Sequence, residues 1–289
     1  MGLSPLAELV FVKLGGSVIT DKTRAAKALP ERIGRLAGEI RAAQDARPDL
    51  AMVLGHGSGS FGHTVGQKYG IHRGIDRGQS WWGYAETAAA AARLNRIVTD
   101  ILLTAGVPVV SIQPSATARC CKGELKELTL YPIRQALEHA LVPLLYGDVA
   151  LDDSQGCTIV STEQVLAYLA QHLRPARIVM VGRVDGVYDR DPLRDAEARP
   201  LRRITPDSFP QVRSQLGGSH ATDVTGGMLT KVSEMVSLVA QGCTERVHLI
   251  SGLRKGALTR VLLDAQHSQG TMIERQEDAN NPTGNTRCC

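Results

Sequence analysis

Residues 51–63 read Ala-Met-Val-Leu-Gly-His-Gly-Ser-Gly-Ser-Phe-Gly-His, a short apolar run followed by nine residues of which four are glycine. The run predicts a buried strand. The glycines allow positive φ angles and let a ligand approach bare backbone N–H groups. Between a strand and a helix, such a turn gathers amide dipoles that suit a phosphate, and Ser60 and His63 can add side-chain donors. Alone, the stretch would indicate an ordinary tight turn with a surface histidine, but other stretches share its character.

A second junction between a strand and a glycine turn lies near the N-terminus. The apolar residues 9–14 predict a strand, and Gly15-Gly16-Ser17 break it. The amides of this turn are expected to hold another phosphate. A lysine within a strand ordinarily snorkels to the surface, but beside this turn we expect the ammonium of Lys13 to face a phosphate. Lys22 follows shortly after and would alone be an ordinary loop lysine.

Further candidate residues follow a strand or begin a helix. Gly147-Asp148 ends a predicted strand, and ligands of open α/β sheets bind at the carboxyl ends of strands. Ser161 is a good N-cap for a helix predicted over 163–171. Glu163 in its first turn either compensates the helix dipole or positions lysines around a transferring phosphate.

From residue 174 the chain begins a second series of α/β units. The apolar run 177–182 predicts a strand, and a turn-rich, charged loop follows over 183–192. Residues 223–228 read Asp-Val-Thr-Gly-Gly-Met and lead into a predicted helix that carries Lys231 on its first turns. The ammonium of Lys231 and the free amides of that helix are expected to face one phosphate chain.

The alternation of strands and helices predicts an α/β protein, with an open, largely parallel sheet sandwiched between helices. We expect two lobes, residues 1–173 and 174–275, followed by a polar, disordered tail at 276–289. Residues 113–130 read as irregular, and residues 152–156 as the polar turn of a hairpin.

The composition excludes several classes of function. With 289 residues, 43% apolar and 21% charged, the chain is typical of globular proteins. The net charge of +4 forms no basic block and aromatic residues make up 4%, so no nucleic-acid partner is expected. No apolar run of about 18 residues predicts a membrane span, and residues 1–8 lack a signal-peptide pattern, so a cytoplasmic location is expected. The six cysteines form no Cys-x-x-Cys pair, which favours reduced thiols over disulfides or a zinc site.

All these candidates indicate one chemistry, the binding of many anionic oxygens at once. They are the glycine turns, Lys13, Lys22, His63 and Lys231. Phosphoryl transfer requires such binding, because two phosphates must lie in line while charge spreads in the transition state. A nucleoside triphosphate would bring Mg²⁺, which bridges its phosphate oxygens, whereas the sequence identifies no metal ligands of its own. P-loop, protein-kinase and nucleophile-elbow motifs are absent, and the glycines lack the acid of a Rossmann dinucleotide site.

Five motifs together resemble the amino acid kinase family, and the resemblance runs from about residue 9 to 274. They are Lys-Leu-Gly-Gly-Ser at 13–17, the turn that ends at His63, Gly-Asp at 147–148, Val-Asp-Gly-Val-Tyr at 184–188 and Asp-Val-Thr-Gly-Gly-Met at 223–228. Within the family, the segments 16–22 and 59–63 look like the isopentenyl phosphate kinases. The resemblance implies an αβα fold, ATP-dependent phosphorylation of isopentenyl phosphate to isopentenyl diphosphate, and a homodimer.

The resemblance also implies roles for individual residues. His63 would donate to the acceptor phosphate, and Lys231 would hold the phosphates of ATP. Lys13 and Lys22 would stabilise the transferring phosphoryl group. The other acceptor-site residues would be Gly57, Ser58, Gly147, Asp148 and Thr162. The other ATP-site residues would be Gly15, Gly16, Ser17, Gly59, Asp185, Tyr188, Asp189, Asp191 and Gly227, with the amides of Gly15, Gly16 and Gly59 cradling phosphate.

The same resemblance implies a different binding role for each lobe. The first lobe would bind the acceptor and dimerise, and the second would bind ATP. An apolar pocket for the five-carbon tail would come from residues 81–112. This segment includes Trp81 and Trp82, which either line that pocket or anchor the core.

Three residues depart from the family pattern. Ser58 stands where the turn usually has glycine, and a serine fits there if its φ is negative. Glu163 replaces the usual aspartate, which puts its role in orienting lysines in doubt. Arg183 replaces an acid that is common in the nucleotide loop.

Two rival functions stay open. A kinase of the same fold would act on a phosphonate such as fosfomycin, a carboxylate, a carbamate or a nucleoside monophosphate. His63 together with Lys22 favours a phosphate or phosphonate acceptor. A non-catalytic nucleotide sensor would not need three lysines suited to phosphoryl transfer.

Overall fold

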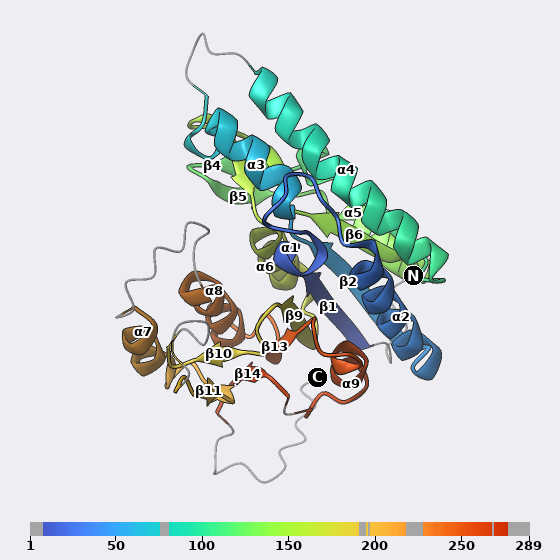
Figure 1. Ribbon diagram of the computed structural model, residues 1–289, viewed down its shortest axis with the longest axis vertical. Coiled ribbons are helices and arrows are strands. Elements are labelled where there is room, and N and C mark those ends of the chain that lie inside the picture. Colours follow the sequence, from blue (N-terminus) through green and yellow to red (C-terminus); the bar gives the residue numbers. More distant parts are fainter. Residues whose placement is uncertain are drawn as a thin grey trace, which may run out of the picture.

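An eight-stranded sheet forms the middle layer of the protein, with helices on both faces (Figure 1). The computed structural model describes residues 8–75, 81–190, 195, 197–217, 228–267 and 269–276. In sheet order, the strands are β12 (Arg203–Ile204), β14 (Thr271–Glu274), β13 (Arg246–Ser251), β9 (Arg177–Gly182), β1 (Glu8–Leu14), β2 (Leu50–His56), β6 (Val142–Tyr146) and β3 (Val109–Ser111). Among these strands every pairing is parallel except that of β13 with β14. The predicted open, largely parallel sheet is therefore confirmed.

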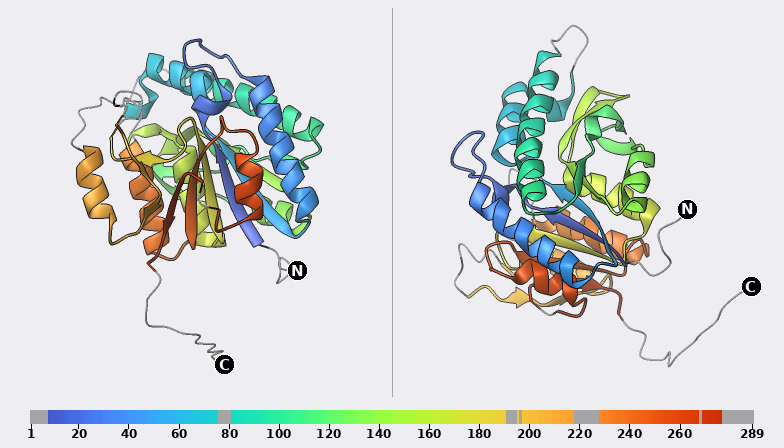
Figure 2. Two further views of the ribbon diagram at one scale, coloured as in Figure 1. Left: turned by 60° about the horizontal axis from the view of Figure 1, so that its bottom comes forward. Right: turned by 90° about the vertical axis from the view of Figure 1, so that its right-hand side faces the viewer.

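The residues of strand β1 belong alternately to two layers of the hydrophobic core, one on each face of the sheet. Figure 2 shows the helices that cover the two faces. Val10, Val12 and Leu14 belong to the layer under α2 (Pro30–Ala46), α4 (Trp82–Thr104) and α9 (Ala257–Leu263). Leu9 and Phe11 belong to the layer under α5 (Tyr131–Glu138), α6 (Thr162–Leu173), α7 (Phe209–Gly217) and α8 (Met228–Ala240). Because side chains alternate along a strand, Lys13 faces the same side as α6 and α8.

A smaller, four-stranded sheet stands beside the main one. It consists of β5 (Glu124–Glu127), β4 (Arg119–Cys121), β7 (Asp148–Asp152) and β8 (Gly156–Val160). The antiparallel pairing of β7 with β8 confirms the predicted hairpin. The prediction that residues 113–130 are irregular is wrong, because they contain β4 and β5. These strands are too short and too charged to show an apolar period. The other short elements are α1 (Gly16–Ile19), α3 (Gly59–Tyr69), η1 (Ile71–Arg73), η2 (Pro114–Ala116), β10 (Val187–Tyr188) and β11 (Pro200–Leu201).

The main sheet continues across the boundary that the sequence predicts between the lobes. Strand β9, which follows residue 174, pairs with β1 from Val10 to Leu14. The division into an acceptor lobe and an ATP lobe stays a prediction. Residues 277–289 of the predicted tail lie outside the described residues.

Helix α4 is 23 residues long and begins with Trp82. The side chains of Trp81 and Trp82 are 47% and 64% exposed, so the interpretation of the tryptophans as core anchors is wrong. Nothing in sequence alone distinguishes an exposed tryptophan at a helix start from a buried one. No helix in the described ranges combines the length and the apolar character that crossing a membrane requires.

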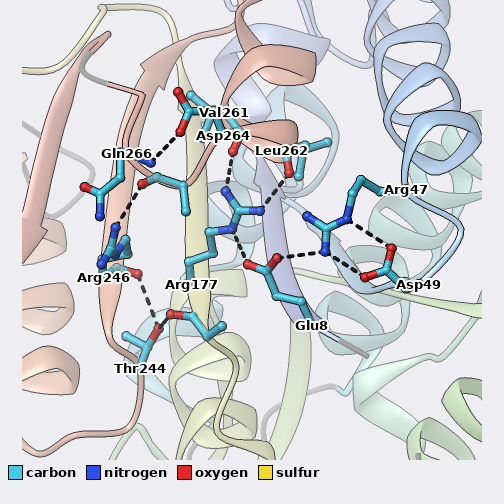
Figure 3. A network of polar contacts seen from close by, with 12 residues as sticks. Glu8, Arg47, Asp49, Arg177, Thr244, Arg246, Val261, Leu262, Asp264 and Gln266 are labelled. Atoms are coloured by element: carbon cyan, nitrogen blue, oxygen red, sulfur yellow. Dashed lines mark hydrogen bonds and ion pairs between the residues drawn. The ribbon is translucent and has the colours of Figure 1, made fainter. Parts of the chain in front are cut away.

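A polar network ties together the amino ends of β1, β9 and β13 (Figure 3). The buried guanidinium of Arg177 donates to the carbonyls of Val261 and Leu262 at 2.5 and 2.7 Å and lies 2.8 Å from the carboxylate of Glu8. Those two carbonyls end α9, where a cation is favoured by the helix dipole. The network therefore fixes α9 and β1 at the edge of the sheet opposite to the carboxyl ends of the strands.

Candidate active site

The carboxyl ends of the central strands bring the predicted glycine turns to one edge of the sheet. Leu14 at the end of β1 pairs with His56 at the end of β2 and with Val181 of β9. His56 in turn pairs with Tyr146 at the end of β6. The turns that follow β1, β2, β6 and β9 are therefore neighbours, as expected for ligand binding in an open α/β sheet.

The turns after β1 and β2 pack backbone against backbone. A Cβ on Gly16 would lie 2.7 Å from the nitrogen of Gly59, and one on Gly57 would lie 2.8 Å from the nitrogen of Gly16. Gly59 has a φ of +52°, and a Cβ there would lie 2.3 Å from Oγ1 of Thr20. Only glycine allows this approach, so the glycines serve the fit between the turns as well as any ligand.

Several amides at this junction remain available for an anion. Among the described residues, the N–H groups of Gly16, Ser17, Ser58 and Gly59 donate to no protein acceptor. The N–H of Gly15 instead donates to the carbonyl of Val181 at 2.9 Å. The N–H of Gly15 thus already has a partner in the neighbouring strand, and its predicted contact with phosphate stays a prediction.

Ser58 adopts φ −68° and ψ −12°, which a serine accommodates without strain. The negative φ meets the condition that the sequence sets for a serine in this turn. Its side chain is close to the next turn of α3, since a Cβ on Gly62 would lie 2.7 Å from the Cβ of Ser58.

Lys13, Glu163 and Lys231 form a charge cluster whose third member, Lys231, is partly exposed. The ammonium of Lys13 donates to the carboxylate of Glu163 at 2.7 Å, and both residues are buried. The ammonium of Lys231 lies 3.9 Å from the same carboxylate oxygen. Burial alone would raise the pKa of Glu163, but the charge and hydrogen bond of Lys13, with the charge of Lys231, hold it below its usual value.

The capping geometry of α6 explains how Glu163 reaches the lysines. Ser161 accepts a hydrogen bond from the N–H of Gln164, and the Gln164 side chain accepts one from the N–H of Ser161. This capping box fixes the first turn of α6 and confirms Ser161 as the N-cap. The side chain of Glu163 is longer than that of the usual aspartate, and it still contacts Lys13.

His63 lies within the electrostatic reach of the same cluster. His63 is exposed at the surface, yet the protein packed around its ring partly removes it from water and lowers its pKa. The positive charges of Lys22 and Lys231 lower this pKa further, against opposing effects of Gly59 and Glu163. Lys22 itself is exposed on the loop between Thr20 and Ala28, whose backbone contacts Ser60 at the start of α3. The structure therefore places His63 within range of the charges of Lys22 and Lys231, and the roles predicted for the three residues stay predictions.

A small cavity of about 10 Å³ adjoins His63 and has room for about one water molecule. It is lined by Ser58, Gly62, His63, Thr87, Ala91, Gly147, Asp148 and Ile159. Four of the predicted acceptor-site residues thus share one cavity, and Thr87 and Ala91 come from the segment predicted to supply an apolar pocket. A larger ligand would require α3, α4 or β8 to shift.

Two further predicted acceptor residues have structural partners in the site. The hydroxyl of Thr162 donates to the carbonyl of His56 at 2.7 Å. The buried carboxylate of Asp148 accepts from the backbone N–H of Ser115 at 3.2 Å and that of Val149 at 2.9 Å. Burial raises the pKa of Asp148, although these hydrogen bonds oppose the shift.

The predicted nucleotide loop after β9 is held by its own side chains. The phenol of Tyr188 donates to the carboxylate of Asp185, which also forms an ion pair with Arg254. The carboxylate of Asp189 accepts from the N–H of Arg199 at 2.8 Å. Asp191 and Gly227 lie outside the described residues, so their predicted roles stay predictions.

Sequence reasoning missed two residues beside the predicted ones. His56, directly before the glycine turn, is fully buried, with contacts from both ring nitrogens. Glu234 lies three residues after Lys231 on α8, and its pKa is raised to about 7 by burial and by the charge of Glu163, against Lys13. The helical spacing from Lys231 is the one signal that points to Glu234.

Comparison with known proteins identifies the family. The model of the amino acid kinase family matches residues 8–251. The chain belongs to the amino acid kinase family. It is 36% identical over 272 residues to the isopentenyl phosphate kinase of Methanothermobacter thermautotrophicus, covering 92% of this chain and 98% of that protein. It is 33% identical to the isopentenyl phosphate kinase of Methanocaldococcus jannaschii, covering 93% and 100%.

A solved structure agrees with this membership of the amino acid kinase family. An X-ray structure of isopentenyl phosphate kinase superposes with a TM-score of 0.77 and 32% identity, covering 92% of this chain and 99% of the other. The fold class and the family resemblance that the sequence indicates are therefore both confirmed.

Proposed function

We propose that this protein transfers the γ-phosphoryl group of ATP to isopentenyl phosphate and releases ADP and isopentenyl diphosphate. An oxygen of the acceptor phosphate forms a bond to the γ-phosphorus, while the bond from that phosphorus to the β,γ-bridging oxygen breaks. The relatives that cover nearly the whole chain carry the name of this activity. One structural observation supports it most strongly: the Lys13–Glu163–Lys231 cluster beside His63 and the four open amides.

The charges of the cluster suit the transition state of phosphoryl transfer. Lys13 is held in one position by Glu163, so its ammonium does not have to reorganise as negative charge spreads over the transferring group. Lys22 and Lys231 add cations from two other elements. The acceptor phosphate is already ionised at neutral pH, so the reaction requires no general base.

The acceptor side is assigned to the cavity at His63. In this proposal the neutral imidazole of His63 donates to the acceptor phosphate, and the N–H of Ser58 adds a second donor from the turn. Gly147 lies opposite, where a Cβ would crowd Oγ1 of Thr162 at 3.3 Å. The apolar tail would enter between α3 and α4, past Thr87 and Ala91.

Mg²⁺, the homodimer and the cytoplasmic location are also part of this proposal. In the described part of the chain, no cluster of three or more histidine, cysteine or acidic side chains suits a metal ion. In this proposal the nucleotide phosphates carry the ion, which would neutralise their charge. The dimer rests on the family resemblance, and the location is carried over as an expectation.

A coupled assay of ADP release tests the proposed function. The purified protein with ATP and Mg²⁺ is compared on isopentenyl phosphate, dimethylallyl phosphate, fosfomycin, UMP and N-acetylglutamate. His63→Ala is the test variant, and His72→Ala, an exposed histidine on η1, is the matched control. We expect turnover on isopentenyl phosphate that His63→Ala alone abolishes.

Other outcomes would change the conclusion. A preference for fosfomycin or UMP would retain phosphoryl transfer but replace the acceptor. No turnover on any acceptor would favour a nucleotide sensor.

A further inference from the structure

We propose that His56 is a positioning residue for the acceptor turn, and this inference rests on the proposed function. A single neutral tautomer of its ring, with the proton on Nδ1, holds the carbonyl of Gly57 inward. The same contact directs the N–H of Ser58 toward the acceptor phosphate. His56 itself touches neither substrate.

The ring of His56 is completely enclosed by protein. Its exposed fraction is 0%, and it stacks on Tyr146 with a centroid distance of 5.5 Å and an interplanar angle of 9°. Tyr146 ends β6 directly before Gly147 of the acceptor cavity. The ring therefore lies beneath the two turns that form the acceptor site.

The contacts of the ring select one tautomer. Nδ1 lies 3.1 Å from the carbonyl oxygen of Gly57, which can only accept, so Nδ1 must carry a proton. Nε2 lies 3.2 Å from the amide nitrogen of Asn95, which can only donate, so Nε2 must be unprotonated. The orientation of the Asn95 amide is fixed in turn, because its oxygen accepts from the hydroxyl of Ser111 at 2.5 Å.

The charges around the ring agree with the neutral form. Burial, opposed by the contact with Gly57, lowers the pKa of His56 to about 4, and the charge of Lys13 on the adjacent strand adds to the shift. The groups that face the ring from α4 and β6, Asn95 and Tyr146, carry no positive or negative charge at neutral pH. The imidazole of His56 is therefore neutral throughout the physiological pH range.

Because the peptide bond is planar, the hydrogen bond from His56 to the Gly57 carbonyl also fixes the direction of the Ser58 N–H. In a trans peptide, the C=O of one residue and the N–H of the next point in opposite directions. No peptide bond of the described chain is cis. Since the Gly57 carbonyl accepts from His56, the Ser58 N–H points away from the core. A Cβ on Gly147, across the cavity, would lie 3.6 Å from this nitrogen.

The carbonyl of His56 fixes the surrounding elements in the same way. It accepts from the N–H of Gly147 at 3.1 Å and from the hydroxyl of Thr162 at 2.7 Å. One residue thus connects the ends of β2 and β6 and the start of α6. The contacts of His56 with the turns are made to Gly57, Gly147 and Thr162, which are all assigned to the acceptor side, so we expect its loss to affect the acceptor first.

Two variants separate positioning from simple core packing. His56→Phe keeps an aromatic ring against Tyr146 but removes both ring nitrogens. His56→Asn places an N–H where Nδ1 stands and so retains the donor to Gly57. We expect His56→Phe to raise the KM for the acceptor by about 10-fold, because the Ser58 N–H would lose its hydrogen bond to the acceptor phosphate. The KM for ATP should change less than about 2-fold. His56→Asn should bring the acceptor KM to within about 3-fold of wild type.

Equal increases in both KM values, or an Asn variant no better than the Phe variant, would overturn the positioning role. Imidazole ¹⁵N spectra of the wild-type protein give a test that does not depend on folding of the variants or on the identity of the acceptor. We expect a pyrrole-type Nδ1 and a pyridine-type Nε2 that do not titrate between about pH 5.5 and 8.5. A protonated Nε2 would contradict the inference even if the proposed function holds. If the wild type prefers another acceptor, the KM comparison is made with that one.

Discussion

The ammonium of Lys13 and the carboxylate of Glu163 lie 2.7 Å apart, although 150 residues separate them in the chain. Lys13 comes from the end of the central strand β1 and Glu163 from the first turn of α6, and both are buried. A buried ion pair that loses one partner leaves an uncompensated charge, which is far more costly than losing an exposed pair. The Lys13–Glu163 pair therefore both stabilises the fold and holds the ammonium of Lys13 in place in the site.

Replacing Glu163 with Gln should reduce both stability and turnover. We expect the free energy of unfolding to fall by about 3 kcal/mol, because the Lys13 ammonium stays buried without its counter-charge. We expect kcat to fall by about 100-fold, because that ammonium loses its fixed position. Urea unfolding and the ADP-release assay measure the two effects.

The control for this variant is Glu86→Gln. Glu86 pairs with Lys68 at 3.7 Å, and both side chains are exposed. Loss of such a pair should change the unfolding free energy by less than about 1 kcal/mol. Similar effects of the two variants on stability would show that the Lys13–Glu163 pair contributes no more than a surface contact.

Replacing Lys22 with Ala should impair turnover far more than ATP binding. Lys22 is exposed, so its removal should leave the fold intact, and its charge is expected to act on the transferring group. We expect kcat to fall by about 100-fold and the Kd for ATP to change less than about 3-fold. Lys27→Ala, an exposed lysine from the same loop, is the control and should behave as wild type. A matched loss in ATP affinity and kcat would place Lys22 in nucleotide binding instead.

The pH dependence of acceptor use should reflect a neutral His63. Because the surrounding protein and the charges of Lys22 and Lys231 lower its pKa from the ordinary value of 6.5, we expect the ring to be mainly neutral in the free enzyme above about pH 7. The kcat/KM for the acceptor reports on free-enzyme groups, so it should not decline on account of His63 as pH rises from about 7 to 8.5. A decline in this range that disappears in His63→Gln would show that the charged ring is the active form.

The sequence predicted the elements of the site better than their contacts. The order of strands and helices, the glycine turns and the lysines all follow from local patterns, such as apolar runs that end in glycine. The ion pair of Lys13 with Glu163 does not follow, because it depends on which strand stands in the middle of the sheet. The same holds for His56, whose role arises from residues on β3, α4, β6 and α6.

The features that sequence reasoning missed have equally specific causes. The partner of the Gly15 amide also escapes the sequence, because the carbonyl of Val181, 2.9 Å away, comes from a strand far along the chain. The short strands β4 and β5 carry the charged residues Arg119, Glu124 and Glu127, so no apolar alternation marks them. The partner of Gly15 lies far away in the chain, and β4 pairs both with the adjacent β5 and with the distant β7.

Glu234 should make the protein lose stability as pH rises. Its folded-state pKa is raised from 4.5 to about 7, so the native state holds a proton that the unfolded state releases between these values. Stability from this group is therefore present below about pH 4.5 and is lost as pH rises toward about 7. Relative to wild type, Glu234→Gln should be more stable at about pH 8 than at about pH 5.

Urea unfolding at the two pH values measures this difference, with Glu245→Gln at an exposed position as the control. A Glu234→Gln variant whose stability relative to wild type is the same at both pH values would show that the carboxyl titrates normally in the fold.

Replacing Gly59 with Ala should destabilise the protein and weaken acceptor binding. The φ of +52° costs a residue with a Cβ about 1–2 kcal/mol, and that Cβ would lie 2.3 Å from Oγ1 of Thr20. Thr20 cannot simply rotate away, since its hydroxyl donates to Gly16 and accepts from the N–H of Ser60. We expect the free energy of unfolding to fall by at least about 2 kcal/mol, and the acceptor KM to rise as the two turns move apart.

Gly38→Ala provides the opposite case within the same protein. Gly38 lies inside α2, where a Cβ would meet nothing within 4 Å, so alanine should stabilise the helix by about 0.5–1 kcal/mol. Urea unfolding of both variants therefore compares the Gly→Ala change at Gly59, where glycine is required, with the same change at Gly38, where it is not. If Gly59→Ala were as stable as wild type, the close packing of the turns after β1 and β2 would not constrain the site. If it were unstable but bound the acceptor normally, Gly59 would serve folding alone.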